Sequence, residues 1–222
     1  MTNSKKNVDC LLFDCDGTLI DTYDIILETM RYTVNDVMVQ DRSDAELMQG
    51  VGTPLHDQMR FFLEGDESRV EKMVALYREH NDRIHDEGVS AFDGIKEALT
   101  ALKDAGYRMG VVTSKRHFLA DRGLQLCGLR DYFEVLIGSD DFPIHKPAPG
   151  PIIEACERLG VSPENSVYIG DSPYDIQAGN AAGCTTIAAL WGMFEPAELR
   201  AECPNLEAKS ASELPNLIDC IQ

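Results

Sequence analysis

Residues 8–19 read Val-Asp-Cys-Leu-Leu-Phe-Asp-Cys-Asp-Gly-Thr-Leu, and this stretch decides how the chain folds. Its first half, residues 8–13, is a short apolar run of the kind that forms a buried strand in a parallel sheet. Two carboxylates, Asp14 and Asp16, follow at once, and Gly17 permits an immediate turn because it has no side chain. The stretch therefore predicts a buried strand that brings two acids to its carboxyl end.

Similar short apolar segments recur along the chain and alternate with helical stretches. The further segments are residues 108–112, 133–137, 166–169 and, more weakly, 185–189. Between them apolar residues recur at helical spacing, and Gly106 and Gly160 are the stop signals expected just after a helix. Strands that alternate with helices predict an α/β fold, a doubly wound, Rossmann-like parallel sheet with helices on both faces.

Residues 22–90 interrupt this alternation, because they carry apolar residues at helical spacing and no strand pattern. We expect a small all-helical insertion. Its expected helices cover residues 23–39, 43–49, 54–63 and 67–87, with a break at 50–54. The predicted organisation is a core of residues 1–21 and 91–222 and an inserted helical domain of residues 22–90.

Composition narrows the possible partners and the location of the protein. The 222 residues include 38 Asp and Glu against 20 Lys and Arg, a formal charge of −18 that repels nucleic acid and anionic membranes. No apolar run reaches the length of a membrane span, and residues 1–8 are polar. The 7 cysteines include no pair at Cys-x-x-Cys spacing, which favours reduced thiols. We expect a cytoplasmic protein that binds neither nucleic acid nor membrane.

Acidic residues follow two of the predicted strands. Asp14 and Asp16 follow the first, and Asp171 and Asp175 follow the strand of residues 166–169. The carboxyl ends of parallel strands share one edge of the sheet, where such folds bind ligands. Clustered carboxylates repel one another unless a cation lies between them, and Mg²⁺ prefers oxygen ligands. These four acids are our candidate Mg²⁺ ligands; turn or helix-capping acids are the alternative.

Two further motifs could hold a phosphate. Thr113, Ser114 and Lys115 end the strand of residues 108–112, where a hydroxyl and free backbone N–H groups can bind phosphate oxygens. Lys146 lies in the proline-rich stretch 145–151, which forbids a helix and presents its ammonium from a rigid support. The ordinary alternatives are a helix-capping serine and an exposed loop lysine.

Together these motifs resemble the haloacid-dehalogenase-like superfamily. They are Asp-Cys-Asp-Gly-Thr at 14–18, the strand end at Thr113, Lys-Pro-Ala-Pro at 146–149 and Gly-Asp-Ser-Pro-Tyr-Asp at 170–175. Their order and approximate spacing are similar to those of the superfamily, and they span the whole predicted core. The helical insertion, which directly follows the first motif, looks like its small helical cap domain.

The resemblance implies a two-step phosphatase reaction. Asp14 would be the nucleophile that becomes an aspartyl phosphate, with its other oxygen on Mg²⁺. Asp16 would protonate the leaving oxygen and later deprotonate the attacking water, and its backbone carbonyl would also bind the metal. Such an acid must hold a proton near neutral pH, which calls for burial or neighbouring acids.

The remaining roles are also implied by the resemblance. Thr113 and Lys146 would hold the phosphoryl group, with Ser114 and Lys115 as further substrate contacts. Asp171 would bind the metal, and Asp175 would assist directly or through water. Mg²⁺ and Lys146 would neutralise the nucleophile and the phosphate, which otherwise repel each other.

The sequence also favours one branch of the superfamily. Asp16 argues against dehalogenases, whose halide needs no proton, and residues 22–60 lack the lysine of phosphonate-cleaving members. The stretch 50–55, Gly-Val-Gly-Thr-Pro-Leu, is similar to phosphoglycolate phosphatases and related pyrophosphatases. We therefore predict hydrolysis of a small-metabolite phosphomonoester, with phosphoglycolate the leading substrate. A pyrophosphatase, a β-phosphoglucomutase-like mutase and a non-catalytic phospholigand-binding module remain alternatives.

The insertion supplies candidate contacts to the leaving group. Thr53, His56 and Arg60 would face the site if a loop of the insertion covers it. His56 and Arg60 are also spaced as an ordinary exposed i, i+4 pair. The sequence is compatible with either a monomer or a homodimer.

Overall fold

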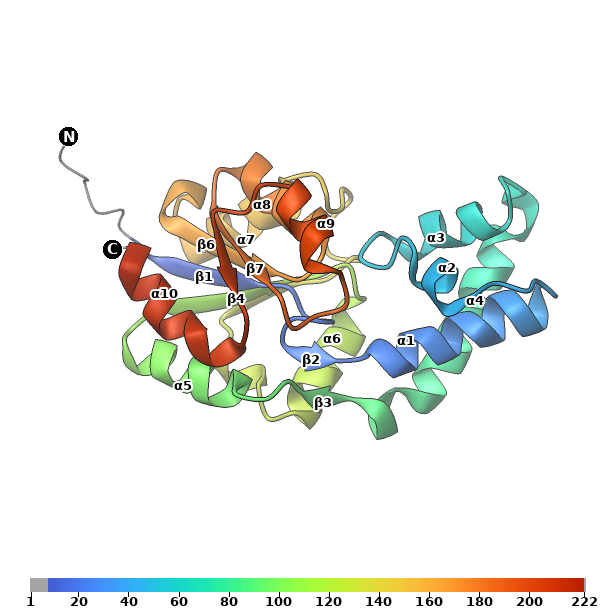
Figure 1. The fold of residues 1–222 in the computed structure, drawn as a ribbon, viewed down its shortest axis with the longest axis horizontal. Helices are drawn as coiled ribbons and strands as arrows, with labels where there is room; N and C mark the ends of the chain where they lie inside the picture. Colours follow the sequence, from blue (N-terminus) through green and yellow to red (C-terminus); the bar gives the residue numbers. More distant parts are fainter. Residues whose placement is uncertain (1–7, 222) are drawn as a thin grey trace.

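The computed structural model describes residues 8–221, which form a six-stranded sheet and a separate group of helices (Figure 1). The strand order is β5-β4-β1-β6-β7-β8, and every neighbouring pair is parallel. The strands are β1 (Cys10–Phe13), β4 (Arg108–Val112), β5 (Val135–Ile137), β6 (Ser166–Gly170), β7 (Thr185–Ala189) and β8 (Leu206–Ala208). The polar segment 1–8 lies, apart from Val8, outside the described residues.

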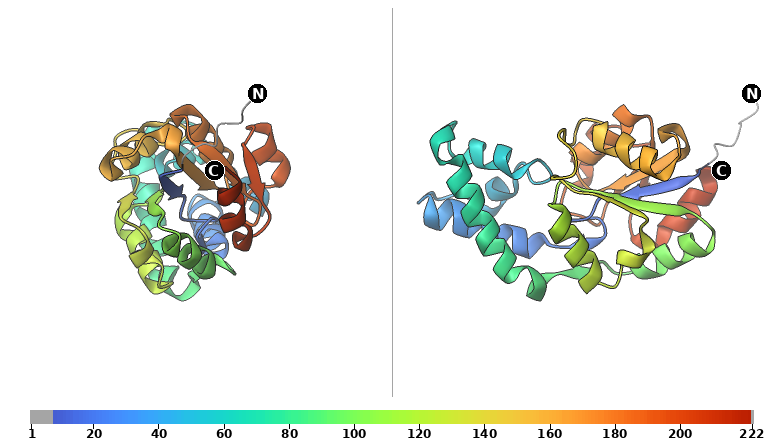
Figure 2. Two further views of the ribbon diagram at one scale, coloured as in Figure 1. Left: turned by 90° about the vertical axis from the view of Figure 1, so that its left-hand side faces the viewer. Right: turned by 180° about the vertical axis from the view of Figure 1, so that it is seen from behind.

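Helices cover both faces of this sheet (Figure 2). They are α5 (Ile95–Asp104), α6 (His117–Leu126), α7 (Gly150–Leu159), α8 (Pro173–Ala182), α9 (Pro196–Ala201) and α10 (Leu214–Ile221). The central strand β1 is fully buried, and its side chains alternate between the faces. Leu11 and Phe13 pack in one cluster with α5, α6 and α10, and Cys10 and Leu12 pack in another with α7 and α8. This two-sided burial confirms the predicted doubly wound α/β core.

Two strands of the sheet begin later than predicted, and one strand of the sheet was missed. β1 begins two residues later than the apolar run at 8–13, and β5 begins two residues later than the run at 133–137. β8 was not predicted: only Ala208 of its 3 residues is buried, so it lacks the apolar run that marks the other strands of the sheet.

The helical insertion comprises α1 (Tyr23–Met30), a π-helical stretch (Arg31–Val37), α2 (Asp44–Met48), α3 (Leu55–Phe62) and α4 (Glu67–Gly88). Two short antiparallel strands, β2 (Ile20–Asp21) and β3 (Ser90–Ala91), connect it to the core. Local signals fix its helices: Ser43 and Glu46 form a capping box at α2, and Asp66 caps α4 by accepting from the Ser68 N–H.

The insertion has an apolar centre of its own. Its buried members are Ile26, Leu27, Met30, Val34, Leu47, Val51, Met59, Phe62, Leu63, Val70, Met73 and Val74. Figure 1 shows the insertion at one end of the elongated molecule, with the loop between α2 and α3 reaching back to the sheet. Across residues 8–221 no helix has the length and apolar character needed to span a bilayer.

Candidate active site

The predicted catalytic residues lie at the carboxyl ends of adjacent strands. Asp14 follows β1, Thr113 follows β4 and Asp171 follows β6, and β1 is hydrogen-bonded to both β4 and β6. The ladder continues into these positions, because the Asp14 N–H donates to the Ile169 carbonyl and the Thr113 N–H to the Ile137 carbonyl, each at 2.9 Å. The sheet therefore sets the backbone positions of the site.

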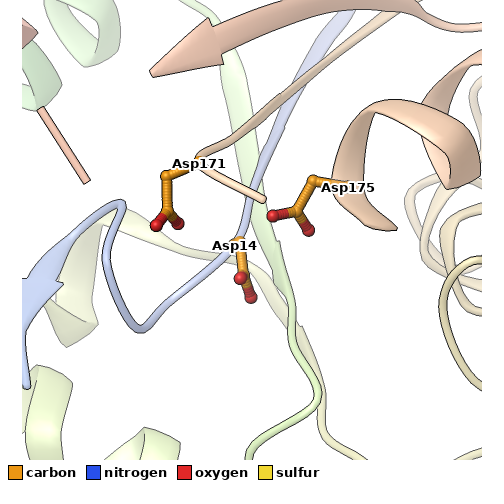
Figure 3. A group of neighbouring side chains, drawn as sticks. All are labelled: Asp14, Asp171 and Asp175. Carbon is orange, nitrogen blue, oxygen red and sulfur yellow. The ribbon is translucent and has the colours of Figure 1, made fainter. Parts of the chain in front are cut away.

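Three carboxylates converge at this edge (Figure 3). Asp14 comes from the end of β1, Asp171 from the loop after β6 and Asp175 from the first turn of α8. All three are buried, and one oxygen of each lies within 4.8 Å of the others. Asp16, the fourth predicted ligand, is not part of this side-chain cluster.

Lys146 is the cation of the cluster. Its Nζ lies 3.0 Å from Asp14 Oδ1 and 2.6 Å from Asp175 Oδ1, and the side chain is buried. Burial opposes the charge, but the Asp14 and Asp175 carboxylates outweigh it and raise the pKa of Lys146. Lys146 also donates to the Tyr168 hydroxyl at 3.3 Å. The proline-rich loop thus places an ammonium against the Asp14 and Asp175 carboxylates.

Both carboxylate oxygens of Asp175 accept hydrogen bonds. Oδ1 accepts from Lys146 Nζ at 2.6 Å and from the Tyr168 hydroxyl at 3.2 Å. Oδ2 accepts from the Ser172 N–H at 3.0 Å and from the Ser172 hydroxyl at 2.6 Å, as part of the capping box of α8. This side chain orients Lys146, and each of its oxygens is within hydrogen-bond distance of two donors.

Asp171 is fixed by two donors and two glycines. Its Oδ1 accepts from the Thr18 hydroxyl and its Oδ2 from the Met193 N–H, each at 2.8 Å. A Cβ on Gly17 or Gly192 would come within 2.2 Å of an Asp171 side-chain atom, and Gly17 has a left-handed φ of +81°. The glycine of the first motif is therefore required by this close approach as well as by the turn.

The cluster fits a hard cation. Asp14 Oδ1 is buried and accepts no hydrogen bond of good geometry despite its 3.0 Å ion pair with Lys146. Burial and the Asp175 carboxylate raise the pKa of Asp14 to about 7, against the opposing effect of Lys146, and the same two causes raise that of Asp171. Carboxylates so destabilised in their charged form offer the oxygen ligands that Mg²⁺ prefers.

Asp16 has different partners. Its Oδ1 accepts from Lys115 Nζ at 2.9 Å and from the Thr22 hydroxyl at 3.0 Å. Lys115, expected to bind substrate, is thus ion-paired to the expected general acid. The two residues are 99 positions apart in sequence, and both line one cavity.

A cavity of about 270 Å³ separates the core from the helical insertion. Asp14, Asp16, Thr113, Ser114, Lys115 and Asp171 line it from the core, and Thr53 and His56 line it from the insertion. Lys146 and Asp175 are not part of this lining, but Lys146 Nζ lies 3.0 Å from the lining residue Asp14. Arg60 is not brought to it, because its guanidinium is exposed and paired with Asp57 and Glu67. The Ser114 hydroxyl donates to the Gly52 carbonyl at 2.7 Å and ties the loop of residues 50–54 to the core.

Sequence reasoning missed several lining residues. Tyr77, Arg78 and Asn81 come from the middle of α4, and Arg116 directly follows the motif at 113–115. No short motif marks the α4 residues, because their approach to the site depends on how the insertion packs on the core. Arg116 could have been found from its position beside Lys115.

The fold and site define a class of protein. The family model of the haloacid dehalogenase-like hydrolases matches residues 11–189, and the chain belongs to this family.

Particular relatives are similar over nearly the whole chain. A pyrophosphatase PpaX of Bacillus cereus is 36% identical over 207 residues, which are 93% of this chain and 94% of that protein. The crystal structure of a predicted phosphatase from Clostridium acetobutylicum has a TM-score of 0.85 and 28% identity, covering 97% of this chain and 99% of that one. The crystal structure of a Lactobacillus plantarum protein assigned as a phosphoglycolate phosphatase has a TM-score of 0.84 and 26% identity. It covers 95% of this chain and 99% of that one.

Proposed function

We propose that this protein is a Mg²⁺-dependent phosphatase that hydrolyses a small phosphorylated metabolite through an aspartyl phosphate on Asp14. One observation carries the proposal: the Asp14 carboxylate lies in the wall of the cavity between core and insertion, clustered with Asp171 and 3.0 Å from Lys146 Nζ. In this proposal residues 22–90 act as a cap domain over a catalytic core of residues 1–21 and 91–222.

The residues that would hold the metal are Asp14 and Asp171 through their side chains. The Asp16 backbone carbonyl and, directly or through water, Asp175 would complete the set. When bound, Mg²⁺ supplies positive charge that favours the ionised carboxylates and neutralises the phosphoryl oxygens. Lys146 supplies a second positive charge, and Asp175 and Tyr168 hold it in place.

In the first transfer an Asp14 oxygen attacks phosphorus as the bond from phosphorus to the leaving oxygen breaks. Asp16 gives its proton to that oxygen, while the Thr113 hydroxyl and Lys146 hold the phosphoryl oxygens. In the second transfer Asp16 takes a proton from water, the water oxygen attacks phosphorus, and the bond to Asp14 breaks to release phosphate. Asp16 thus acts in both displacements, first as an acid and then as a base. Dividing the reaction into two displacements lowers the barrier of each step.

Two substrates have specific support. The likeness to the Bacillus cereus pyrophosphatase supports pyrophosphate. The residues at 50–55 and the likeness to the Lactobacillus plantarum protein support phosphoglycolate. Both reactions use the same nucleophile and differ only in the leaving group.

The test is phosphate release from p-nitrophenyl phosphate, phosphoglycolate and pyrophosphate. Asp14→Asn should lower the rate roughly 10³-fold or more because the nucleophile is lost, and chelation of Mg²⁺ should have a similar effect. Asp219→Asn, an exposed change on α10, should leave the rate unchanged. Equal rates for wild type and Asp14→Asn would disprove the proposed nucleophile.

A further inference from the structure

Two arginines line the cavity, one from the insertion and one from the core where the insertion meets it. Arg78 lies in the middle of α4, and Arg116 is the residue before α6. Both line the cavity that also contains Asp14. They are cationic groups in a chain whose formal charge is −18.

Arg78 is not neutralised within the described chain. Its Nε is buried and has no hydrogen-bond partner, and no ion pair joins its guanidinium to a carboxylate of residues 8–221. Glu71, Asp82 and Asp140 are near enough to attract it without reaching ion-pair distance. An unpaired, partly buried donor of this kind costs stability unless something binds it.

Arg116 makes the position of Arg78 less favourable. Burial and the Arg116 guanidinium both lower the pKa of Arg78, although arginine keeps its charge at neutral pH. Arg116 pairs with Asp82 at 2.8 Å through one amino group, which leaves its other N–H groups for another acceptor. Asp140, the nearby acid in the lining, already accepts from the His117 N–H at 2.7 Å.

We infer that Arg78 and Arg116 form a second anion-binding position in the cavity, which holds a negatively charged group on the leaving-group side of the substrate. The inference rests on the proposed function and narrows its substrate class. The preferred substrate carries two anionic groups joined by a short link, as pyrophosphate and phosphoglycolate do. A phosphate ester with a neutral leaving group would leave this position empty.

The geometry of arginine suits this task. A guanidinium presents several donors in a planar fork that matches both phosphate and carboxylate oxygens. Arg78 comes from the insertion, whereas Asp14 and Lys146 come from the core, so a two-anion substrate would bridge the two parts. Substrate selection would then depend on the insertion, and phosphoryl transfer on the core.

Binding of unreactive ligands tests the inference directly. Calorimetry at fixed Mg²⁺ should show that wild type binds methylenediphosphonate, which has two anionic groups, more tightly than methylphosphonate. Arg78→Met should weaken methylenediphosphonate binding about 10- to 100-fold, the range for a lost charge-assisted contact, and leave methylphosphonate binding unchanged. Arg69→Met is the matched control, because Arg69 is an exposed arginine of the same helix.

Two further measurements exclude a structural role. The thermal midpoint of Arg78→Met without ligand should equal or exceed that of wild type, because an unpaired charge is removed. Arg78→Lys, which retains charge but loses the fork, should bind methylenediphosphonate with intermediate affinity. An equal ligand preference in wild type and Arg78→Met, or no preference in wild type, would overturn the inference.

Turnover separates this inference from the proposed function. The kcat/KM of Arg78→Met should fall for pyrophosphate and phosphoglycolate and stay within about 3-fold for p-nitrophenyl phosphate, whose leaving group is uncharged at this position. Selective binding of methylenediphosphonate without any turnover would reject the phosphatase and retain the anion position. Equal losses on all three substrates would reject the anion position and retain the phosphatase.

Discussion

At the scale of single residues, the site depends on contacts that local sequence does not specify. Asp14, Thr113, Lys146 and Asp171 could be predicted because each lies beside a strand or a distinctive loop, and parallel strands bring such positions together. The pairing of Asp16 with Lys115 could not be predicted, since it joins positions 99 apart. Arg78 carries no local signal at all, because an arginine on a long helix is usually solvated.

Gly17 illustrates how one position serves both the turn and the carboxylate cluster. Gly17→Ala would place a methyl group 2.2 Å from Asp171 Oδ2 at a φ of +81°. We expect the variant to displace Asp171 and to lose about 100-fold in kcat, the scale of a misplaced catalytic group. Steady-state phosphate release and thermal unfolding measure the two effects.

Gly106→Ala is the matched control for this change. Its φ is +91°, but no heavy atom lies within 4 Å of the added Cβ. This variant should lose about 1–2 kcal/mol of unfolding free energy, the cost of placing a side chain at a left-handed φ, and its kcat should be unchanged. A similar kcat in both variants would contradict the role assigned to the contact between Gly17 and Asp171.

At the scale of elements, the sequence predicted five of the six strands of the sheet and the helices of the insertion. β2 and β3 were missed because segments of two residues have no measurable period. β8 is as short as β5, but β5 is buried at all 3 residues and lies in an apolar run, whereas in β8 only Ala208 is buried. The predicted helix over 23–39 was found as α1 and a π-helical continuation, a change of hydrogen-bond spacing that apolar periodicity does not reveal.

The junction of α4 and α6 contains a buried histidine. His85 is 1% exposed, its Nε2 lacks a hydrogen-bond partner, and its Nδ1 lies 3.2 Å from Asp86 Oδ1. Burial and Lys115 lower the pKa of His85, against the opposing effects of Asp86 and Asp16. The folded protein therefore resists a proton that the unfolded chain accepts below about pH 6.5.

This difference predicts how stability depends on pH. The contribution of neutral His85 is fully present above about pH 6.5 and is lost as the pH falls below that value. Urea unfolding of wild type should therefore show a larger loss of free energy between pH 7.5 and 5.5 than His85→Gln shows. Other carboxylates and histidines contribute to both proteins and cancel in the comparison. Identical losses would mean that His85 does not resist protonation.

At the scale of the whole molecule, the insertion is held on the core by a few polar contacts. Arg116 pairs with Asp82, Arg122 pairs with Asp86, and Ser114 donates to the Gly52 carbonyl. Exposed ion pairs contribute about 0.2–1 kcal/mol each and weaken with salt. The arrangement of insertion and core in Figure 1 should therefore open readily.

A double variant tests this prediction. Asp82→Asn with Asp86→Asn should shift the equilibrium between closed and open forms about 2- to 30-fold toward the open form, the sum of two such pairs. Small-angle X-ray scattering at low salt should then report a larger radius of gyration. Asp104→Asn with Asp219→Asn makes the same change of charge at exposed positions on α5 and α10. An equal radius in both double variants would show that the two pairs do not hold the insertion closed.

The short ladder between β2 and β3 has a consequence for how this chain can change. Ile20 lies opposite Ala91 and Asp21 opposite Ser90, so the chain leaves the core and re-enters it at neighbouring points. Paired strands lie about 5 Å apart, a gap that a tight turn or a different domain could also close. The insertion can therefore be exchanged as a unit while the strand ends that carry the carboxylate cluster stay in place.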